Sequence, residues 1–351
     1  NILDIFVMSD NPNFSTYEDK FLLTKSSKEQ KVFDVLLLYF GKDENVLIPD
    51  FVEIICALAF NECKQIKKVE TSVNSKLKII ESSAFFDTSI ESIILPPSLT
   101  ELQERWCFNS PNLSEIKVMP NNPIFSTCNN NEVLLKKSSI SKENYDVLVF
   151  ALQNIDTLTI LDDIEIISPF AFFNCNKLKT VEFSRESKLR IIGDFSFFKL
   201  NIEYISIPSH VTNIGQFAFS ECEFIKNFEI PSNSELEVID EYAFSKSSIK
   251  KIIIPSSLKT ICKFSFIYCP QLKYVVIQEN SNLQTIDSLA FESTSITSLY
   301  LPKKLENIDF DMLSSCSYLQ IIEFNEILDI NNYFSLFDQF RNEIIIMVPR
   351  K

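Results

Sequence analysis

Hydrophobic and polar positions recur along the chain in a unit of 22 to 25 residues. Each unit has an aliphatic residue, two polar residues, a second aliphatic residue, a short turn, a small residue followed by Phe, and then an alternating aliphatic strand. The fullest copy runs from Leu258 to Ile277. One such unit cannot bury its apolar side alone, whereas stacked units share a continuous core. The pattern therefore predicts a solenoid.

The Phe that follows the small residue sets the register of this repeat. We place it in nine of ten positions, with Cys107-Phe108 as the third copy and Met312-Leu313 in the tenth place. The intervals between the ten successive positions are 25, 23, 64, 25, 22, 25, 22, 25 and 22 residues. Apart from the interval of 64, long and short units alternate, and a 25-residue unit and a 22-residue unit together span 47 residues. The nine are Phe60, Phe85, Phe108, Phe172, Phe197, Phe219, Phe244, Phe266 and Phe291.

Each unit is expected to fold as a strand, a corner, a short second extended piece and a tight helical turn that carries the Phe. Pro follows many strands, and because it cannot donate to a ladder it ends the strand and forms the corner. The 25-residue units carry extra Asn and Ser residues there, as in Ser232–Leu236 and Glu279–Leu283, which is typical of a surface loop.

The interval of 64 residues contains an insertion that resembles the N-terminal region. Asn11–Thr16 parallels Asn122–Thr127 at an offset of 111 residues. Alternating segments predict a β-hairpin in each, which pairs Phe21–Leu23 with Val35–Phe40 and Val133–Leu135 with Val147–Leu152.

The whole chain, residues 1–351, is predicted to be a single leucine-rich-repeat solenoid, mostly β with short helical turns. It has hairpin islands at about 11–45 and 122–155 and a C-terminal cap at about 325–351. The cap is expected to contain a helix-like segment, Asn331–Arg341, and a final strand, Ile344–Val348, because an open end would expose core.

Composition excludes several kinds of partner. The net charge is −14, and Lys and Arg form no long cluster, so neither a nucleic acid nor an anionic membrane is an expected partner. The apolar runs are too short to span a membrane. Only 3 Gly are present, which disfavours phosphate-binding loops and a fold with many positive-φ turns. The chain starts without Met, so we expect a piece of a longer protein or a mature form.

The nine Cys residues are expected to be free thiols. Five of them follow the Phe position by three residues and therefore occupy the same place in every second coil. Two coil steps, about 10 Å, exceed the separation that a disulfide can bridge. A ladder of this kind also does not converge on a metal. The five are Cys63, Cys175, Cys222, Cys269 and Cys316.

No set of residues indicates catalysis, a cofactor or a metal, so the chain is not expected to be an enzyme. The single His, His210, follows Pro208 at a corner, with no nucleophile motif nearby. Trp106 is expected to pack in its turn rather than to bind a ligand. The pair Asp162-Asp163 lacks any context that would form a cleft.

The strand face offers the candidate site. Because side chains alternate along a strand, the middle residue of each aliphatic triplet, and the residue two before it, should point outward to a concave surface. In the C-terminal half these positions become apolar and aromatic, which is typical of partner sites but is also typical of residues that only stiffen a sheet. The candidate binding residues are Tyr204, Ile253, Tyr274, Val276 and Tyr300.

The unit resembles the BspA-like, or treponemal-type, leucine-rich repeat. In that family a strand ending in Ile-Pro precedes Val-x-x-Ile-Gly-x-x-Ala-Phe-x-x-Cys, and the best match here is Ile205–Pro208 followed by Val211–Cys222. The Asn-Pro-x-Phe-Ser segments also resemble hairpin islands of the family. The family Gly is present only at Gly193 and Gly215. The resemblance to this family covers nearly the whole chain.

The resemblance implies a surface or secreted binding protein. Members of the family occur in oral and gut bacteria and in trichomonad parasites, and they are associated with adhesion to host cells, matrix proteins and other microbes. The low-Gly, Phe-rich composition suggests an AT-rich genome such as that of some protists. We therefore expect a cell-surface module that binds a host protein, matrix or glycan. The alternative is a cytoplasmic interaction scaffold.

Overall fold

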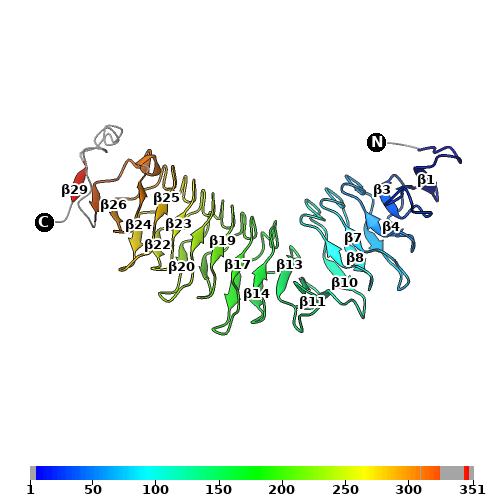
Figure 1. Ribbon diagram of the computed structural model, residues 1–351, viewed down its shortest axis with the longest axis horizontal. Helices are drawn as coiled ribbons and strands as arrows, with labels where there is room; N and C mark the ends of the chain where they lie inside the picture. The colour runs from blue at the N-terminus through cyan, green and yellow to red at the C-terminus, as the bar shows by residue number, and fades with distance from the viewer. Residues whose placement is uncertain (1–4, 309, 325–343, 348–351) are drawn as a thin grey trace. The chain divides into compact units, whose positions relative to one another are not determined.

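The computed structural model describes residues 5–308, 310–324 and 344–347. It divides into two compact units, unit 1 (Asn1–Gln153) and unit 2 (Asn154–Lys351). In each unit, short parallel strands repeat coil after coil, and one row of strands lies across the coil from a second row (Figure 1). The predicted solenoid of alternating strands, corners and turns is confirmed in both units.

Unit 1 combines parallel ladders with two antiparallel segments. The longer strands of its coils pair in the order β10-β8-β6-β4. The shorter strands pair in the order β5-β7-β9, and β5 pairs with the last strand of the N-terminal island. The strands are β4 (Asn45–Leu47), β5 (Ile54–Ile55), β6 (Lys68–Glu70), β7 (Ile79–Ile80), β8 (Ser92–Leu95), β9 (Glu101–Leu102) and β10 (Glu115–Val118).

Each hairpin island is a three-stranded antiparallel meander. The predicted hairpins are its second and third strands, and an additional strand precedes each pair. A β-bulge falls between Leu22 and Leu23 in the first and between Leu134 and Leu135 in the second, which are equivalent positions. The strands are β1 (Phe14–Tyr17), β2 (Phe21–Thr24), β3 (Val35–Tyr39), β11 (Phe125–Cys128), β12 (Val133–Lys136) and β13 (Val147–Ala151).

Unit 2 contains two rows of parallel strands. The longer strands are β14 (Thr157–Ile160), β16 (Thr180–Phe183), β18 (Tyr204–Ser206), β20 (Asn227–Glu229), β22 (Lys251–Ile254), β24 (Tyr274–Ile277), β26 (Ser298–Leu301), β28 (Ile321–Phe324) and β29 (Ile345–Met347). The two-residue strands are β15 (Ile166–Ile167), β17 (Ile191–Ile192), β19 (Asn213–Ile214), β21 (Val238–Ile239), β23 (Thr260–Ile261), β25 (Thr285–Ile286) and β27 (Asn307–Ile308). A 3₁₀ helix, η1, spans Phe310–Leu313.

The last strand, β29, pairs in parallel with β28. It covers most of the predicted final strand, Ile344–Val348. The predicted helix-like segment, Asn331–Arg341, lies outside the described residues.

The core of unit 2 contains a continuous row of Phe rings, one from each of six successive turns. The row runs through Phe172, Phe197, Phe219, Phe244, Phe266 and Phe291, all fully buried. Successive ring centroids lie 4.9 to 5.5 Å apart. This separation is close to the spacing of neighbouring strands, so one ring per coil fills the interior without gaps.

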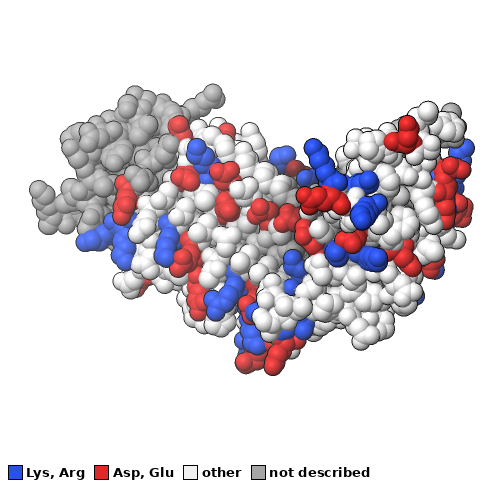
Figure 2. Space-filling model, turned by 45° about the vertical axis from the view of Figure 1, so that its right-hand side comes forward, with Lys and Arg blue, Asp and Glu red and all other residues white. Residues whose placement is uncertain are grey.

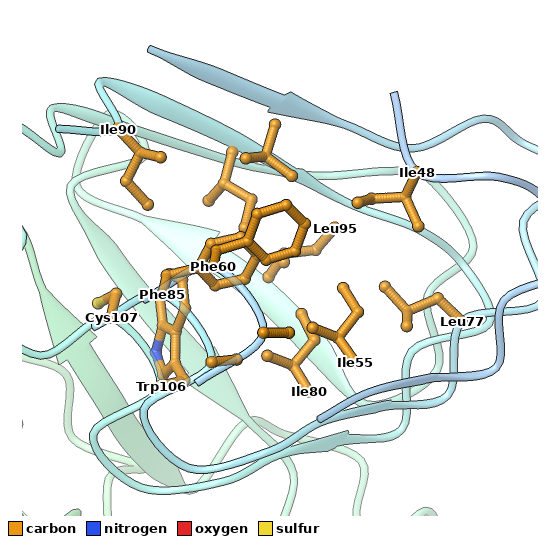
Figure 3. Close-up of a cluster of buried hydrophobic side chains, with 14 of the residues drawn as sticks. Ile48, Ile55, Phe60, Leu77, Ile80, Phe85, Ile90, Leu95, Trp106 and Cys107 are labelled. Carbon is orange, nitrogen blue, oxygen red and sulfur yellow. The ribbon is translucent and has the colours of Figure 1, made fainter. Parts of the chain in front are cut away.

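The third copy of the repeat in unit 1 has a different register from the predicted one. The amide of Phe85 donates to the carbonyl of Trp106, as the amide of Phe60 donates to that of Ala84. Trp106 therefore occupies the small-residue position and Cys107 the Phe position, so the assignment of Phe108 was wrong. The Trp106 ring lies beside Phe85 in the core (Figure 3). Compared with the other turns, the large and the small side chain have exchanged places, with Trp106 first and Cys107 second.

This correction makes the repeat more regular. The interval from Phe85 to Cys107 is 22 residues instead of 23, so the 25/22 alternation also holds in unit 1. Phe108 instead stacks on Phe86 at the edge of the turn, with ring centroids 6.1 Å apart. The expectation that Trp106 packs rather than binds a ligand is consistent with its side chain, which is buried.

The turns that carry the Phe row contain many residues with positive φ, contrary to the expectation from the Gly shortage. In each turn the residues two before and two after the Phe position are left-handed, as at Phe217 (φ 54°) and Glu221 (φ 58°). All such positions are occupied by residues other than Gly. A left-handed residue with a side chain costs roughly 1 kcal/mol or more, so the turns must be stabilised by contacts between coils.

Those contacts are hydrogen bonds and stacked rings. The amide of each core Phe in unit 2 donates to a carbonyl in the next turn over 2.7 to 3.0 Å; the acceptor is Ala or Ser in five turns and Met312 in the last. Side chains at the first left-handed position form a second aromatic row, with centroids 4.6 to 4.9 Å apart. The turn is thus held by its neighbours rather than by Gly. This half-buried row comprises Phe170, Phe195, Phe217, Tyr242 and Phe264.

The five registered cysteines are buried free thiols, as predicted. Three of them place Sγ 3.0 to 3.1 Å from the carbonyl oxygen of the preceding core Phe, as Cys222 does with Phe197. Burial raises the pKa of Cys222 to about 12, which keeps the thiol protonated and able to donate. These cysteines therefore link neighbouring coils through hydrogen bonds.

Candidate functional site

The outward side chains of the longer strands in unit 2 form the candidate site. In β22 and β24 exposed and buried residues alternate strictly, so residues such as Ile252 and Val275 enter the core and their neighbours face solvent. Parallel in-register pairing then aligns the outward residues of successive coils in two columns.

Four of the five predicted residues lie together on three consecutive strands, and we call them the apolar strip: Ile253, Tyr274, Val276 and Tyr300. Ile253 pairs with Val276 across β22 and β24, and Tyr300 occupies the same column on β26, which contacts β24. Tyr274 lies in the second column, two residues before Val276. Tyr274 is 51% exposed and Val276 43%, whereas Tyr300 is half-buried. The strip is therefore an exposed apolar surface within an ordered sheet.

Tyr204 lies apart from the strip. It is on β18 and pairs with Asn227, so the coil of β20 separates it from Ile253. Its hydroxyl donates to Glu229 Oε2 over 2.7 Å, and this bond is the main cause of the raised pKa of Tyr204. The predicted set is therefore one cluster of four and one tyrosine in a polar setting.

Carboxylates border the strip at both ends of its column. Glu229 precedes Ile253 and Glu323 follows Tyr300, with Tyr300 and Glu323 paired across β26 and β28. Burial, followed by the charges of Glu323 and Glu279, raises the pKa of Tyr300. The Lys273 ammonium lies 5.5 Å from the Tyr274 ring centroid. In the view of Figure 2, acidic and basic side chains are interspersed, with no broad area of one sign.

Apolar residues of the last two strands extend this surface and were not among the predicted ones. Ile321 pairs with Ile345, and Met347 pairs with Glu323. Ile345 is 59% exposed and Met347 46%. The sequence signal was an aliphatic run after the last recognisable repeat, but only the pairing of β29 with β28 places it beside the strip.

The residues considered for catalysis are in ordinary surface positions. His210 Nδ1 lies 3.0 Å from Glu235, and both side chains are about half exposed. Asp163 pairs with Lys188 at 2.5 Å, and Asp162 accepts a hydrogen bond from Ser184. In the part of the chain that the structure describes, no group of three or more His, Cys, Asp or Glu residues is arranged to hold a metal ion. Among the same residues there is no helix with the length and hydrophobicity to cross a membrane.

The stacked strands, corners and turns are those of a leucine-rich-repeat solenoid. Residues 39–147, 144–273 and 237–342 match the family described as the BspA type leucine rich repeat region, with six copies. The chain therefore belongs to the BspA-type leucine-rich-repeat family.

Solved structures share the fold at low sequence identity. The pneumococcal vaccine antigen PcpA has 19% identity and a TM-score of 0.58, with 89% of this chain and 69% of PcpA covered. A leucine-rich repeat protein from Eubacterium ventriosum has 18% identity and a TM-score of 0.53, with 79% of this chain and 93% of that chain covered. No curated protein matches the sequence. These likenesses support the solenoid fold alone.

Proposed function

We propose that the chain is a non-catalytic recognition module at the cell surface, which binds a host protein, matrix component or glycan through the strand face of unit 2. The observation that carries this proposal is the apolar strip. Ile253, Val276 and Tyr300 follow one another in one column of an exposed sheet, with Tyr274 beside them. Exposed aromatic and aliphatic side chains on a rigid support are typical of the energetic centre of a binding surface.

The family and one neighbour support the surface location. PcpA is named as a vaccine antigen, and the family is that of the BspA type repeat. The composition supports a protist source, whereas both solved neighbours come from bacteria. Antibody staining of intact cells should label them without permeabilisation, and labelling only after permeabilisation would exclude adhesion.

Substitution of the exposed Tyr274 and the half-buried Tyr300 tests the strip itself. Tyr274→Ala and Tyr300→Ala should each weaken binding to a matrix ligand by roughly 10-fold or more, since aromatic residues at such centres contribute about 2 kcal/mol. The measurement is biolayer interferometry on immobilised collagen, fibronectin and laminin. Tyr318→Ala is the matched control because Tyr318 is 64% exposed and lies outside the strip. Equal affinity of both strip variants and the control would exclude the strip as the binding surface.

A cytoplasmic interaction scaffold is the second candidate, and the cysteines favour it. All nine are free thiols, and unpaired thiols are characteristic of reducing compartments. The same sheet would then bind a cytosolic protein. Staining that appears only in permeabilised cells, together with loss of a cytosolic partner in Tyr274→Ala, is the expected result for this role.

A further inference from the structure

Two adjoining hollows lie where the longer strands of unit 2 reach their corners, and we call them together the corner trough. The first, of about 270 Å³, lies at Pro208, with Arg185 and Asn233 among its walls. The second, of about 550 Å³, is lined by residues that include Asn227, Glu229 and Lys251. Both are bordered by Ser206, Pro231 and Asn233, so the two hollows share part of their walls.

The alternating repeat length explains the recess. Pro208 is at the short corner of a 22-residue coil. The corners on either side, at residues 184–188 and 231–235, belong to 25-residue coils and carry additional polar residues. Because neighbouring coils are stacked about 4.8 Å apart, a short corner between two long ones leaves a hollow.

The polar side chains of the trough are available to a ligand. Within the described residues, Arg185, Asn227, Asn233 and Lys251 are exposed and make no side-chain hydrogen bond or ion pair. Several other cations of unit 2 are paired with a carboxylate of the preceding coil. Examples are Lys188 with Asp163 at 2.5 Å, Lys226 with Glu203 at 3.1 Å and Lys259 with Glu237 at 2.8 Å.

The chemistry of the trough matches a neutral sugar chain. Asparagine amides both donate and accept, the Arg185 guanidinium donates, and Glu229 accepts, which is the mixed set that sugar hydroxyls require. The rings of Pro208 and Pro231 offer apolar C–H surface. Beside the second hollow, Tyr204 is 50% exposed and its hydroxyl holds Glu229 in place. The trough holds two cations, Arg185 and Lys251, and one carboxylate, Glu229, so its local charge is small, and the net charge of −14 on the whole chain disfavours a polyanion.

We propose that the corner trough is a binding site for a neutral oligosaccharide chain. Arg185 follows β16 and Lys251 begins β22, three coil steps or about 14 Å along the stack, so several sugar units fit rather than one. The site is independent of the proposed role of the apolar strip, with which it shares only Ile253.

Titration calorimetry with cellohexaose, mannohexaose and chitohexaose tests this site. At least one of the three should bind the purified chain, and its affinity should change little between low and high salt because no ionic contact to the ligand is involved. The double variant N227A/N233A should lose roughly 30-fold in affinity, which corresponds to about 2 kcal/mol for the two hydrogen bonds that are removed. Asn176→Ala combined with Gln216→Ala removes two exposed amides elsewhere and should leave the affinity unchanged.

Further variants and a charged ligand separate the alternatives. Tyr274→Ala and Tyr300→Ala should not change oligosaccharide affinity, so failure of the strip and failure of the trough are distinguishable. The proposal is overturned if none of the three hexasaccharides binds or if the control variant loses as much affinity as N227A/N233A. Tighter, salt-sensitive binding of a hyaluronan hexasaccharide would also overturn it and identify a polyanion site.

Discussion

The row of core rings is built from Phe alone in unit 2, whereas in unit 1 it combines Tyr, Phe and Trp. In unit 2 every turn from Phe172 to Phe291 contributes a small residue followed by Phe. In unit 1 the row passes through Tyr39, Phe60 and Phe85 and then ends at Trp106, whose ring contacts Phe85 on one side and Phe150 of β13 on the other. From Tyr39 to Trp106 in unit 1 and from Phe172 to Phe291 in unit 2, each turn contributes one large ring, and the residue that supplies it can change.

The exchange has a cost that is visible in the structure. Trp106 is 2% exposed, and within the described residues its indole Nε1 has no hydrogen-bond partner. A buried donor without a partner costs on the order of 1–3 kcal/mol. The indole ring also contacts Phe150 of the island strand β13, with ring centroids 5.8 Å apart. In unit 1 the coil that adjoins the second island therefore contains a buried indole N–H without a hydrogen bond.

The largest expected effect is the loss of a ring from the middle of the unit 2 row. Phe219→Ala should lower the free energy of unfolding by about 3–5 kcal/mol, because Phe219 is fully buried between Phe197 and Phe244 and leaves a cavity when truncated. Urea denaturation followed by circular dichroism measures this loss. Phe224→Ala is the control, since Phe224 is 51% exposed and should change stability by less than about 0.5 kcal/mol. Equal losses in the two variants would contradict the stacked-core description.

The next prediction tests the exchange in unit 1. Trp106→Ala alone should cost about 3–5 kcal/mol, as a large ring is removed from the core. The double variant W106A/C107F restores the order found in unit 2 and removes the unpaired indole donor, so it should recover at least half of that loss. The measurement is the same urea titration, analysed as a double-mutant cycle with C107F. A double variant no more stable than Trp106→Ala would show that the position of the ring matters as well as its volume.

The fold could be predicted well from the sequence because the residues that define the repeat are the buried ones. Period, strand, corner and islands all follow from hydrophobic spacing, which is the physical requirement of a stack. The third copy was misassigned because Cys107-Phe108 satisfies the small-Phe rule locally. The hydrogen bond from Phe85 to Trp106, together with the positive φ of Arg105 and Asn109, shows that Cys107 holds the Phe position. The positive-φ turns were missed because the usual signal is Gly, whereas here coil-to-coil stacking of residues such as Phe217 stabilises them.

The candidate site was predicted less completely. Alternation along each strand was sufficient to expect that Tyr274 and Val276 face outward. Adjacency across coils depends on register, so the separation of Tyr204 from the strip and the contribution of Ile345 became clear only from strand pairing. The corner trough depends on how far successive corners project. Its sequence signal is the alternation of short and long corners, but depth is a three-dimensional property.

A smaller effect is expected from a buried carboxylate in the islands, both of which lie in unit 1. Asp34 is buried, and this desolvation favours the neutral form. Hydrogen bonds from the Ser26 amide and hydroxyl and from Gln30 outweigh it, so the pKa of Asp34 is lowered. A lowered folded pKa stabilises the protein above the unfolded value of about 4, and this stabilisation is lost as the pH falls through the folded pKa.

Asp34→Asn should therefore cost roughly 1.5–3 kcal/mol at neutral pH, with a difference from the native chain that shrinks below about pH 4. Urea titrations over a series of pH values measure it. Asp10→Asn is the control because Asp10 is exposed. If the difference in unfolding free energy between Asp34→Asn and the native chain stayed constant below about pH 4, the carboxylate charge would not be the stabilising feature.

The smallest effect distinguishes the two islands from each other. Asp146 accepts hydrogen bonds from the amide and hydroxyl of Ser138, as Asp34 does from Ser26. Four residues before the carboxylate, the second island has Lys142, whose Nζ lies 3.0 Å from Asp146 Oδ2, whereas the first island has Gln30. Lys142→Gln makes the second island like the first and should cost less than about 1 kcal/mol, because the lysine is partly exposed. Since that cost is electrostatic, it should diminish at high salt, whereas Gln30→Ala should show the same cost at low and high salt. A salt-independent cost for Lys142→Gln would mean that the lysine stabilises the island through packing of its aliphatic stem rather than through its charge.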